Sequence, residues 1–210
     1  MKHVRVKICG ITNARDAVAA VDAGADALGF VFFDRSARCI SFHVAAEIVR
    51  ELPPFIAKVG VFVDPAEETV REAIQVCGID TLQFHGGESP AFCERFGLKT
   101  IKAFRVRGPK TLEEAKAYPR TAWLLDSHVP NQLGGTGETF DWELAREATK
   151  FSRMVILAGG LTAENVAQAV QQVRPYAIDV SSGVESEPGK KDHRKLTLFV
   201  TAAHTPATHG

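Results

Sequence analysis

Short apolar segments rich in β-branched residues alternate with longer amphipathic segments along the 210-residue chain. This rhythm is typical of repeated strand–helix units, in which helices connect consecutive parallel strands. Eight segments fit strands, at 4–8, 27–32, 57–63, 81–84, 99–104, 121–125, 154–157 and 177–180. The clearest helix patterns occupy 13–23, 44–52, 67–76, 142–149, 163–172 and 192–203. Helix signals after the fourth and fifth strands are weaker.

Residue types at the helix ends support this division. Thr12 and Thr162 fit N-caps, and Gly24 and Gly78 fit C-terminal stops. Eight strand–helix units use nearly the whole chain and leave no room for a second domain. We therefore predict one domain over residues 1–204 and a disordered tail over 205–210.

Polar side chains recur on one face of several predicted strands. Lys7 shares a face with Cys9, and Asp126 falls at the end of the sixth strand. A doubly wound sheet buried on both faces reads as nearly continuous hydrophobic residues. A closed (β/α)8 TIM barrel of the α/β class, with a polar mouth, fits the pattern better. The mouth is where barrel active sites lie, although internal ion pairs would also explain polar interior residues.

Composition narrows the function classes. The chain has 25 basic and 25 acidic residues, which argues against nucleic acid or an anionic membrane as the main partner. The four cysteines show neither metal-ligand spacing nor a dense disulfide framework. No apolar run approaches the roughly 18 residues of a membrane span, and the start lacks a signal-peptide pattern. We expect a soluble, cytoplasmic protein.

Two strand-end residues are candidates for acid–base chemistry. Cys9 is either a small buried hydrophobe or, if a nearby cation such as Lys7 favours its thiolate, a base or nucleophile. Asp126 is either a turn residue or a placed acid. Across a barrel mouth, the two groups could transfer protons at two atoms of one substrate.

Three glycine-rich segments, 134–137, 158–161 and 181–185, follow predicted strands. Glycine lets backbone N–H groups approach an anion closely, and loops after strands seven and eight are the recurring phosphate site of barrels. Turns also use glycine for structural reasons alone. Two such loops at the two expected strands favour a phosphate site.

Other polar residues allow two readings. Arg35 and Arg38 are either solvated loop charges or, for a planar guanidinium, partners of a substrate carboxylate. Gln83 and His85 are either satisfied core polar groups or contacts to a sugar or to Asp126. We expect three residues only to open the last helix: Lys190, Lys191 and His193.

Ten motifs, in order along nearly the whole chain, resemble those of phosphoribosylanthranilate isomerases. They are KICGIT (7–12), GFVF (29–32), SAR (36–38), QFHG (83–86), LD (125–126), GGTG (134–137), FDW (140–142), GGL (159–161), DVSSGVE (179–185) and PGKKD (188–192). Each motif alone is weak, and together they are specific. Phe84 replaces an aliphatic residue of the family pattern, which we expect to alter packing only.

The resemblance implies an Amadori rearrangement of N-(5-phosphoribosyl)anthranilate in tryptophan biosynthesis. It implies that Cys9 is the general base that removes the proton from sugar C2, and that Asp126 is the general acid that protonates the ring oxygen. Arg38 would meet the anthranilate carboxylate. The other substrate-binding positions it implies are Gln83, His85, Gly135, Gly159, Gly160, Asp179, Ser181, Ser182 and Gly183. The partner is a small phosphosugar, no metal, nucleotide or flavin is needed, and monomer and dimer stay open.

Rival readings make different demands. A pentose-phosphate epimerase needs metal-ligand His and Asp residues at several strand ends, which His85 alone does not supply. A histidine-pathway isomerase would place an Asp where Cys9 stands. A non-catalytic phosphosugar sensor needs the phosphate loops and could dispense with Cys9 and Asp126.

Overall fold

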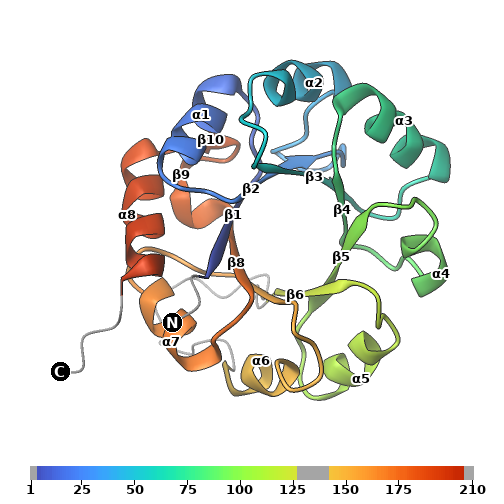
Figure 1. The fold of residues 1–210 in the computed structure, drawn as a ribbon, viewed down its shortest axis with the longest axis vertical. Helices are drawn as coiled ribbons and strands as arrows, with labels where there is room; N and C mark the ends of the chain where they lie inside the picture. The colour runs from blue at the N-terminus through green and yellow to red at the C-terminus, as the bar shows by residue number, and fades with distance from the viewer. Residues whose placement is uncertain (1–3, 127–141, 206–210) are drawn as a thin grey trace.

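Eight parallel strands close into a barrel in chain order, with β1 hydrogen-bonded to both β2 and β8 (Figure 1). The computed structural model describes residues 4–126 and 142–205. The predicted α/β class and barrel architecture are confirmed. The strands are β1 (Arg5–Cys9), β2 (Ala27–Val31), β3 (Ala57–Phe62), β4 (Thr81–Phe84), β5 (Lys99–Arg105), β6 (Ala122–Asp126), β7 (Val155–Ala158) and β8 (Ala177–Val180).

Helices form an outer ring around the strands (Figure 1). They are α1 (Ala14–Asp22), α2 (Phe42–Arg50), α3 (Glu67–Cys77), α4 (Pro90–Cys93), α5 (Lys110–Lys116), α6 (Trp142–Ala148), α7 (Val166–Val173) and α8 (His193–His204). The weak helix signals after the fourth and fifth strands correspond to the short helices α4 and α5. Within the described ranges, no helix is long and apolar enough to cross a membrane.

Side-chain alternation along the strands divides the core into two layers. Between the strands and the helices lie large, fully buried side chains such as Phe30, Phe62 and Phe84. The opposite strand face carries smaller residues such as Val61 and Leu124, which belong to a separate buried cluster inside the barrel. Each strand therefore packs against the helices with one face and against the other strands inside the barrel with the other.

Two predicted N-caps are wrong. The N-cap of α1 is Asn13 rather than Thr12, and the Asn13 side chain accepts a hydrogen bond from the backbone N–H of Asp16. Helix α7 begins after Asn165, so Thr162 lies one turn too early. Ser, Thr, Asn and Asp are all good N-caps, so a run of such residues does not reveal which one the backbone uses.

The predicted glycine stops are confirmed. Gly24 and Gly78 follow α1 and α3 with φ values of 100° and 65°, a left-handed conformation that is cheap for glycine. The predicted tail, 205–210, lies outside the described residues except for Thr205.

A hairpin between β8 and α8 replaces the simple helix start expected from the sequence. A 3-10 turn (Ser182–Val184) leads into β9 (Glu185–Glu187), which pairs antiparallel with β10 (Lys190–Lys191). Lys190 and Lys191 therefore do not open the helix, and that expectation is wrong. Asp192 caps α8 by accepting hydrogen bonds from two backbone N–H groups, and His193 is the first helical residue, as expected.

A buried ion pair connects the β4–α4 loop to the outer face of β5. Lys102 Nζ lies 3.2 Å from Glu88 Oε2 and 2.7 Å from the Gly86 carbonyl oxygen. Both charged side chains are at most 4% exposed. Charges buried this deeply are stable only when they are paired, so neither partner can be removed without exposing the other's charge to an apolar environment.

We predict that Glu88→Gln lowers the free energy of unfolding by about 3 kcal/mol, because it leaves the Lys102 ammonium buried without a counter-charge. Urea denaturation measures the change. The matched control is Glu187→Gln, which removes a carboxylate whose ion pair with Lys190 is mostly solvent-exposed and should matter by less than about 0.5 kcal/mol. Equal, small effects of both substitutions would contradict the prediction.

Candidate active site

Cys9 and Asp126 are the last residues of β1 and β6, at the carboxyl-terminal end of the barrel. Cys9 belongs to the buried cluster inside the barrel, and Asp126 lies two residues after Leu124, another member of that cluster. Side chains two residues apart on a strand share a face. Both predicted catalytic groups therefore lie on the interior face at the barrel mouth, where this fold builds its active sites.

A buried ion pair lies one layer below the thiol. Lys7 Nζ is 2.8 Å from Asp179 Oδ1 on β8, and both side chains are at most 10% exposed. Burial alone would lower the pKa of Lys7, but Asp179 and Cys9 together outweigh it and the pKa is raised. Asp179, a predicted substrate ligand, thus has Lys7 as its partner in this structure.

Burial raises the pKa of the Cys9 thiol above its ordinary value. Lys7 favours the thiolate, but the neighbouring Asp179 carboxylate opposes it, and a smaller favourable contribution from Lys191 does not reverse the balance. Burial, together with the opposing charge of Asp179, is therefore the reason why a nearby cation does not activate the thiol by itself.

Glycine on the neighbouring strand makes room for these groups. A Cβ atom at Gly29 on β2 would lie 2.9 Å from Cys9 Sγ and 3.2 Å from Lys7 Nζ. The first separation is shorter than real Cβ contacts, and the second is tighter than most of them. Gly29 thus allows the thiol and the ammonium to occupy the barrel interior together.

Two polar atoms on the β4 side of the mouth lack hydrogen-bond partners among the described residues. They are Gln83 Oε1 and His85 Nε2, and both atoms are buried. His85 Nε2 lies 3.3 Å from Asp126 Oδ2, close enough for an ion pair, but without the geometry of a hydrogen bond. Buried polar atoms are normally satisfied, so Gln83 and His85 are not satisfied core groups, and His85 has instead the contact to Asp126 that the sequence left open.

Arg38, in the β2–α2 loop, is not a solvated charge. Its Nε and Nη2 atoms donate to the two carboxylate oxygens of Glu185 at 2.8 and 2.6 Å. Hydrogen bonds to Glu185 raise the pKa of Arg38 against the opposing effect of burial. Arg35, by contrast, is exposed in the same loop, as expected of a solvated charge.

The loops after β7 and β8 lie against each other. A Cβ atom at Gly183 would lie only 2.0 Å from the carbonyl oxygen of Leu161, so only glycine permits this approach. Gly159 and Gly160 have φ values of 87° and 64°. The two glycine-rich segments predicted from the sequence are thus adjacent in space, as a shared anion site requires.

Of two further predicted substrate-binding residues, the structure gives Ser181 a backbone partner and does not describe Gly135. The Ser181 hydroxyl donates to the backbone carbonyl oxygen of Cys9 at 3.1 Å, so it joins β1 to the β8 loop. Gly135, in the segment 134–137, lies outside the described residues. Over the described ranges, no three His, Cys, Asp or Glu side chains form a group that could hold a metal ion.

Comparison with known proteins decides the family. The family model described as N-(5'-phosphoribosyl)anthranilate (PRA) isomerase matches residues 6–202. The chain belongs to this family. A relative from Geobacter sp. (strain M21), named N-(5'-phosphoribosyl)anthranilate isomerase, is 54% identical over 199 residues, which cover 95% of this chain and 97% of that protein.

Solved structures of PRA isomerases agree. The crystal structure of phosphoribosyl anthranilate isomerase from Thermotoga maritima has a TM-score of 0.90 and 44% identity, with coverage of 95% of this chain and 98% of that one. A further PRA isomerase structure, in complex with reduced 1-(o-carboxyphenylamino)-1-deoxyribulose 5-phosphate, has a TM-score of 0.87 and 42% identity over the same shares.

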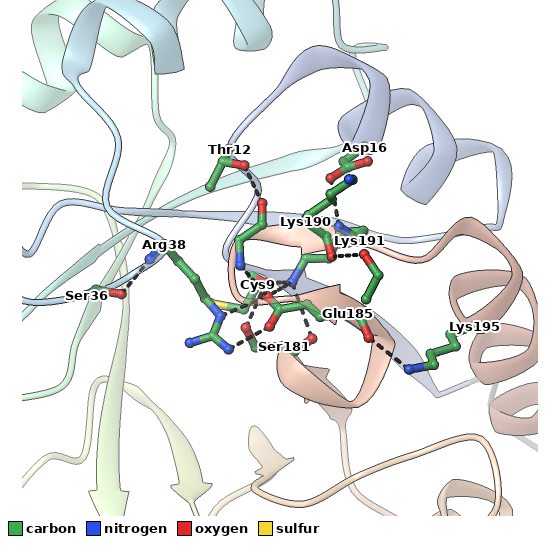
Figure 2. A network of polar contacts seen from close by, with 12 residues as sticks. Cys9, Thr12, Asp16, Ser36, Arg38, Ser181, Glu185, Lys190, Lys191 and Lys195 are labelled. Carbon is green, nitrogen blue, oxygen red and sulfur yellow. Dashed lines mark hydrogen bonds and ion pairs between the residues drawn. The ribbon is translucent and has the colours of Figure 1, made fainter.

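For this PRA isomerase family member, reasoning from the sequence missed two buried residues at the mouth, Glu185 and Lys191. Lys191 Nζ donates to Glu185 Oε1 at 2.8 Å, to the Cys9 carbonyl oxygen at 2.6 Å and to the Ser181 carbonyl oxygen at 3.3 Å (Figure 2). Glu185 falls in the DVSSGVE motif, from which no separate role was predicted for it. No local pattern distinguishes these charges, because Arg38 and Cys9, which they contact at the mouth, lie far away in the chain.

We predict that the Cys9 thiolate of the ligand-free protein forms at a higher pH than that of an unfolded peptide thiol. A raised pKa favours the neutral form, so the titration midpoint moves upward. The measurement is the thiolate ultraviolet absorbance of wild type minus that of Cys9→Ala, which cancels the other three thiols. A midpoint at or below that of the peptide would contradict the charge balance described above.

Proposed function

We propose that the protein catalyses the Amadori rearrangement of N-(5-phosphoribosyl)anthranilate to 1-(2-carboxyphenylamino)-1-deoxyribulose 5-phosphate, a step of tryptophan biosynthesis. Cys9 acts as general base and Asp126 as general acid. The observation that carries the proposal is a thiol and a carboxylate at two strand ends of a chain that matches the PRA isomerase family over residues 6–202. The relative that binds the reduced carboxyphenylamino-deoxyribulose phosphate supports the substrate class.

Proton movements account for the whole reaction. Asp126 donates a proton to the ring oxygen as the bond between C1 and that oxygen breaks, and the nitrogen lone pair forms the C1=N iminium. Cys9 then removes the proton from C2, so that the C–H electrons form a C1=C2 double bond and the C1=N π electrons return to the nitrogen. Finally C1 gains a proton while the C2 hydroxyl loses one, which leaves a ketone at C2. No electrons leave the substrate, so the reaction needs no redox cofactor.

The substrate itself activates the thiol in this proposal. In the ligand-free protein, burial and Asp179 hold the pKa of Cys9 up. Ring opening creates a positive iminium next to C2, and an opposite charge at that distance favours the thiolate. Cys9 therefore becomes a thiolate only after Asp126 has protonated the ring oxygen, so the two proton transfers occur in that sequence.

The two ends of the substrate meet different loops of the mouth. Backbone N–H groups around Gly159, Gly160, Ser182 and Gly183 hold the phosphate, supported by the close contact between the two loops. Arg38 meets the anthranilate carboxylate. The unsatisfied atoms of Gln83 and His85 contact the sugar between them. The remaining proposed contacts are Gly135, Asp179 and Ser181.

We predict that Cys9→Ala and Asp126→Asn each lower kcat by about 10²- to 10⁴-fold, the usual contribution of one acid or base. The assay follows loss of fluorescence of freshly prepared substrate. Both variants should still bind the reduced product, measured by calorimetry. The control is Cys39→Ser, a thiol in the β2–α2 loop. Undiminished turnover in either test variant would exclude the assigned role and favour a non-catalytic sensor.

We predict that Gly183→Ala raises KM roughly 10- to 100-fold, because an added Cβ pushes the β8 loop away from Leu161 and displaces the phosphate amides. Gly87→Ala is the matched control, since its Cβ would meet only Asp64 Oδ1 at an ordinary 3.5 Å. Steady-state kinetics separate KM from kcat. A Gly183→Ala enzyme with normal KM would mean that the phosphate binds elsewhere.

A further inference from the structure

Three buried or half-buried charges lie together at the mouth beside Cys9, and the proposed proton transfers use none of them. Glu185 stands at the centre, between the Arg38 guanidinium and the Lys191 ammonium (Figure 2). The side chains of Glu185 and Lys191 are 4% and 0% exposed, and that of Arg38 is 26% exposed. Burying three charges is costly, so this cluster needs a reason beyond loop packing.

Glu185 occupies one edge of the Arg38 guanidinium and leaves the other edge open. The Glu185 carboxylate accepts hydrogen bonds from the side edge, which is formed by Nε and Nη2. A guanidinium has five N–H groups, and its end edge, formed by Nη1 and the second N–H of Nη2, can hold another carboxylate with two hydrogen bonds. Among the residues that the structure describes, Glu185 is the only hydrogen-bond partner of that guanidinium, and Nη1 points away from it (Figure 2).

Lys191 supplies the charge that makes this arrangement useful. A carboxylate alone would neutralise Arg38 and weaken its attraction for an anion. The Lys191 ammonium shares Glu185 Oε1 and is fixed by the carbonyl oxygens of Cys9 and Ser181. Two cations and one carboxylate leave one net positive charge, matched to one substrate carboxylate. The two cations also lower the pKa of Glu185 despite its burial, so that it stays ionised.

We infer that Glu185 is a positioning residue for substrate recognition: it holds the Arg38 guanidinium so that its end edge faces the anthranilate carboxylate, while Lys191 preserves the positive charge of the site. This inference rests on the proposed function, in which Arg38 binds that carboxylate. It predicts that Glu185 acts only on substrates that carry the carboxylate. A residue that merely stabilises the loop would affect every substrate alike.

The test compares two substrates, N-(5-phosphoribosyl)anthranilate and N-(5-phosphoribosyl)aniline, which lacks the carboxylate. Glu185→Gln keeps the shape but removes the charge and places an N–H group against Arg38. We expect KM for the anthranilate substrate to rise about tenfold with kcat within about threefold. For the aniline substrate, kcat/KM should equal that of wild type. The matched control, Glu187→Gln on the exposed side of the same hairpin, should change neither.

Arg38→Ala separates the two proposals. If Arg38→Ala discriminates between the substrates and Glu185→Gln does not, the positioning role is overturned while the proposed function stands. If Arg38→Ala does not discriminate, Arg38 does not bind the carboxylate, and the positioning role of Glu185 falls together with the contact proposed for Arg38, while the proposed rearrangement is untouched. Should Glu185→Gln fold poorly, Glu185→Asp retains the charge but shortens its reach, and the same substrate-dependent rise in KM is expected. Equal losses on both substrates would overturn the positioning role.

Discussion

The hydrogen-bonded pairing of β1 with β8, which closes the barrel, is the constraint on which the site depends. Its register sets Lys7 opposite Asp179, 172 residues apart in the chain, and gives the barrel interior a neutral ion pair. The same pairing brings the end of β1 to the loop after β8. Ser181 and Lys191 then bond to the carbonyl oxygen of Cys9. The proposed base and the proposed phosphate loop are thus joined through one backbone group.

Charge pairing gives the two sides of the mouth a different net charge. At the thiol, burial is the largest effect and Asp179 offsets part of the influence of Lys7, so the pKa of Cys9 is raised. Around Glu185 the charges do not cancel, because Arg38 and Lys191 share one carboxylate. The net positive charge of the mouth therefore lies around Glu185, beside the Cys9 thiol, and not at the thiol itself. This division fits an enzyme that must attract an anionic substrate before it uses a thiolate.

The fold and the strand-end residues were predictable because they depend on short periods in the sequence. Alternation indicated the barrel, and the strand limits put Cys9 and Asp126 at the ends of two strands, while only the family resemblance implied their roles. The partners of Arg38 were not predictable, since Glu185 lies 147 residues away and only barrel closure brings it near. Lys191 was misread because it stands next to a helix start, where lysine is commonplace. The N-cap predictions were wrong for a local reason, because Thr12 and Asn13 are equally good candidates.

The most direct test of the account is a crystal structure of the protein with reduced 1-(2-carboxyphenylamino)-1-deoxyribulose 5-phosphate bound. We expect sugar C2 about 3–3.5 Å from Cys9 Sγ, a separation from which proton transfer can begin. The phosphate should contact the amides around Gly160 and Gly183, with Asp126 on the far side of the sugar. A ligand with its phosphate elsewhere, or with C2 turned away from Cys9, would contradict the proposed mechanism.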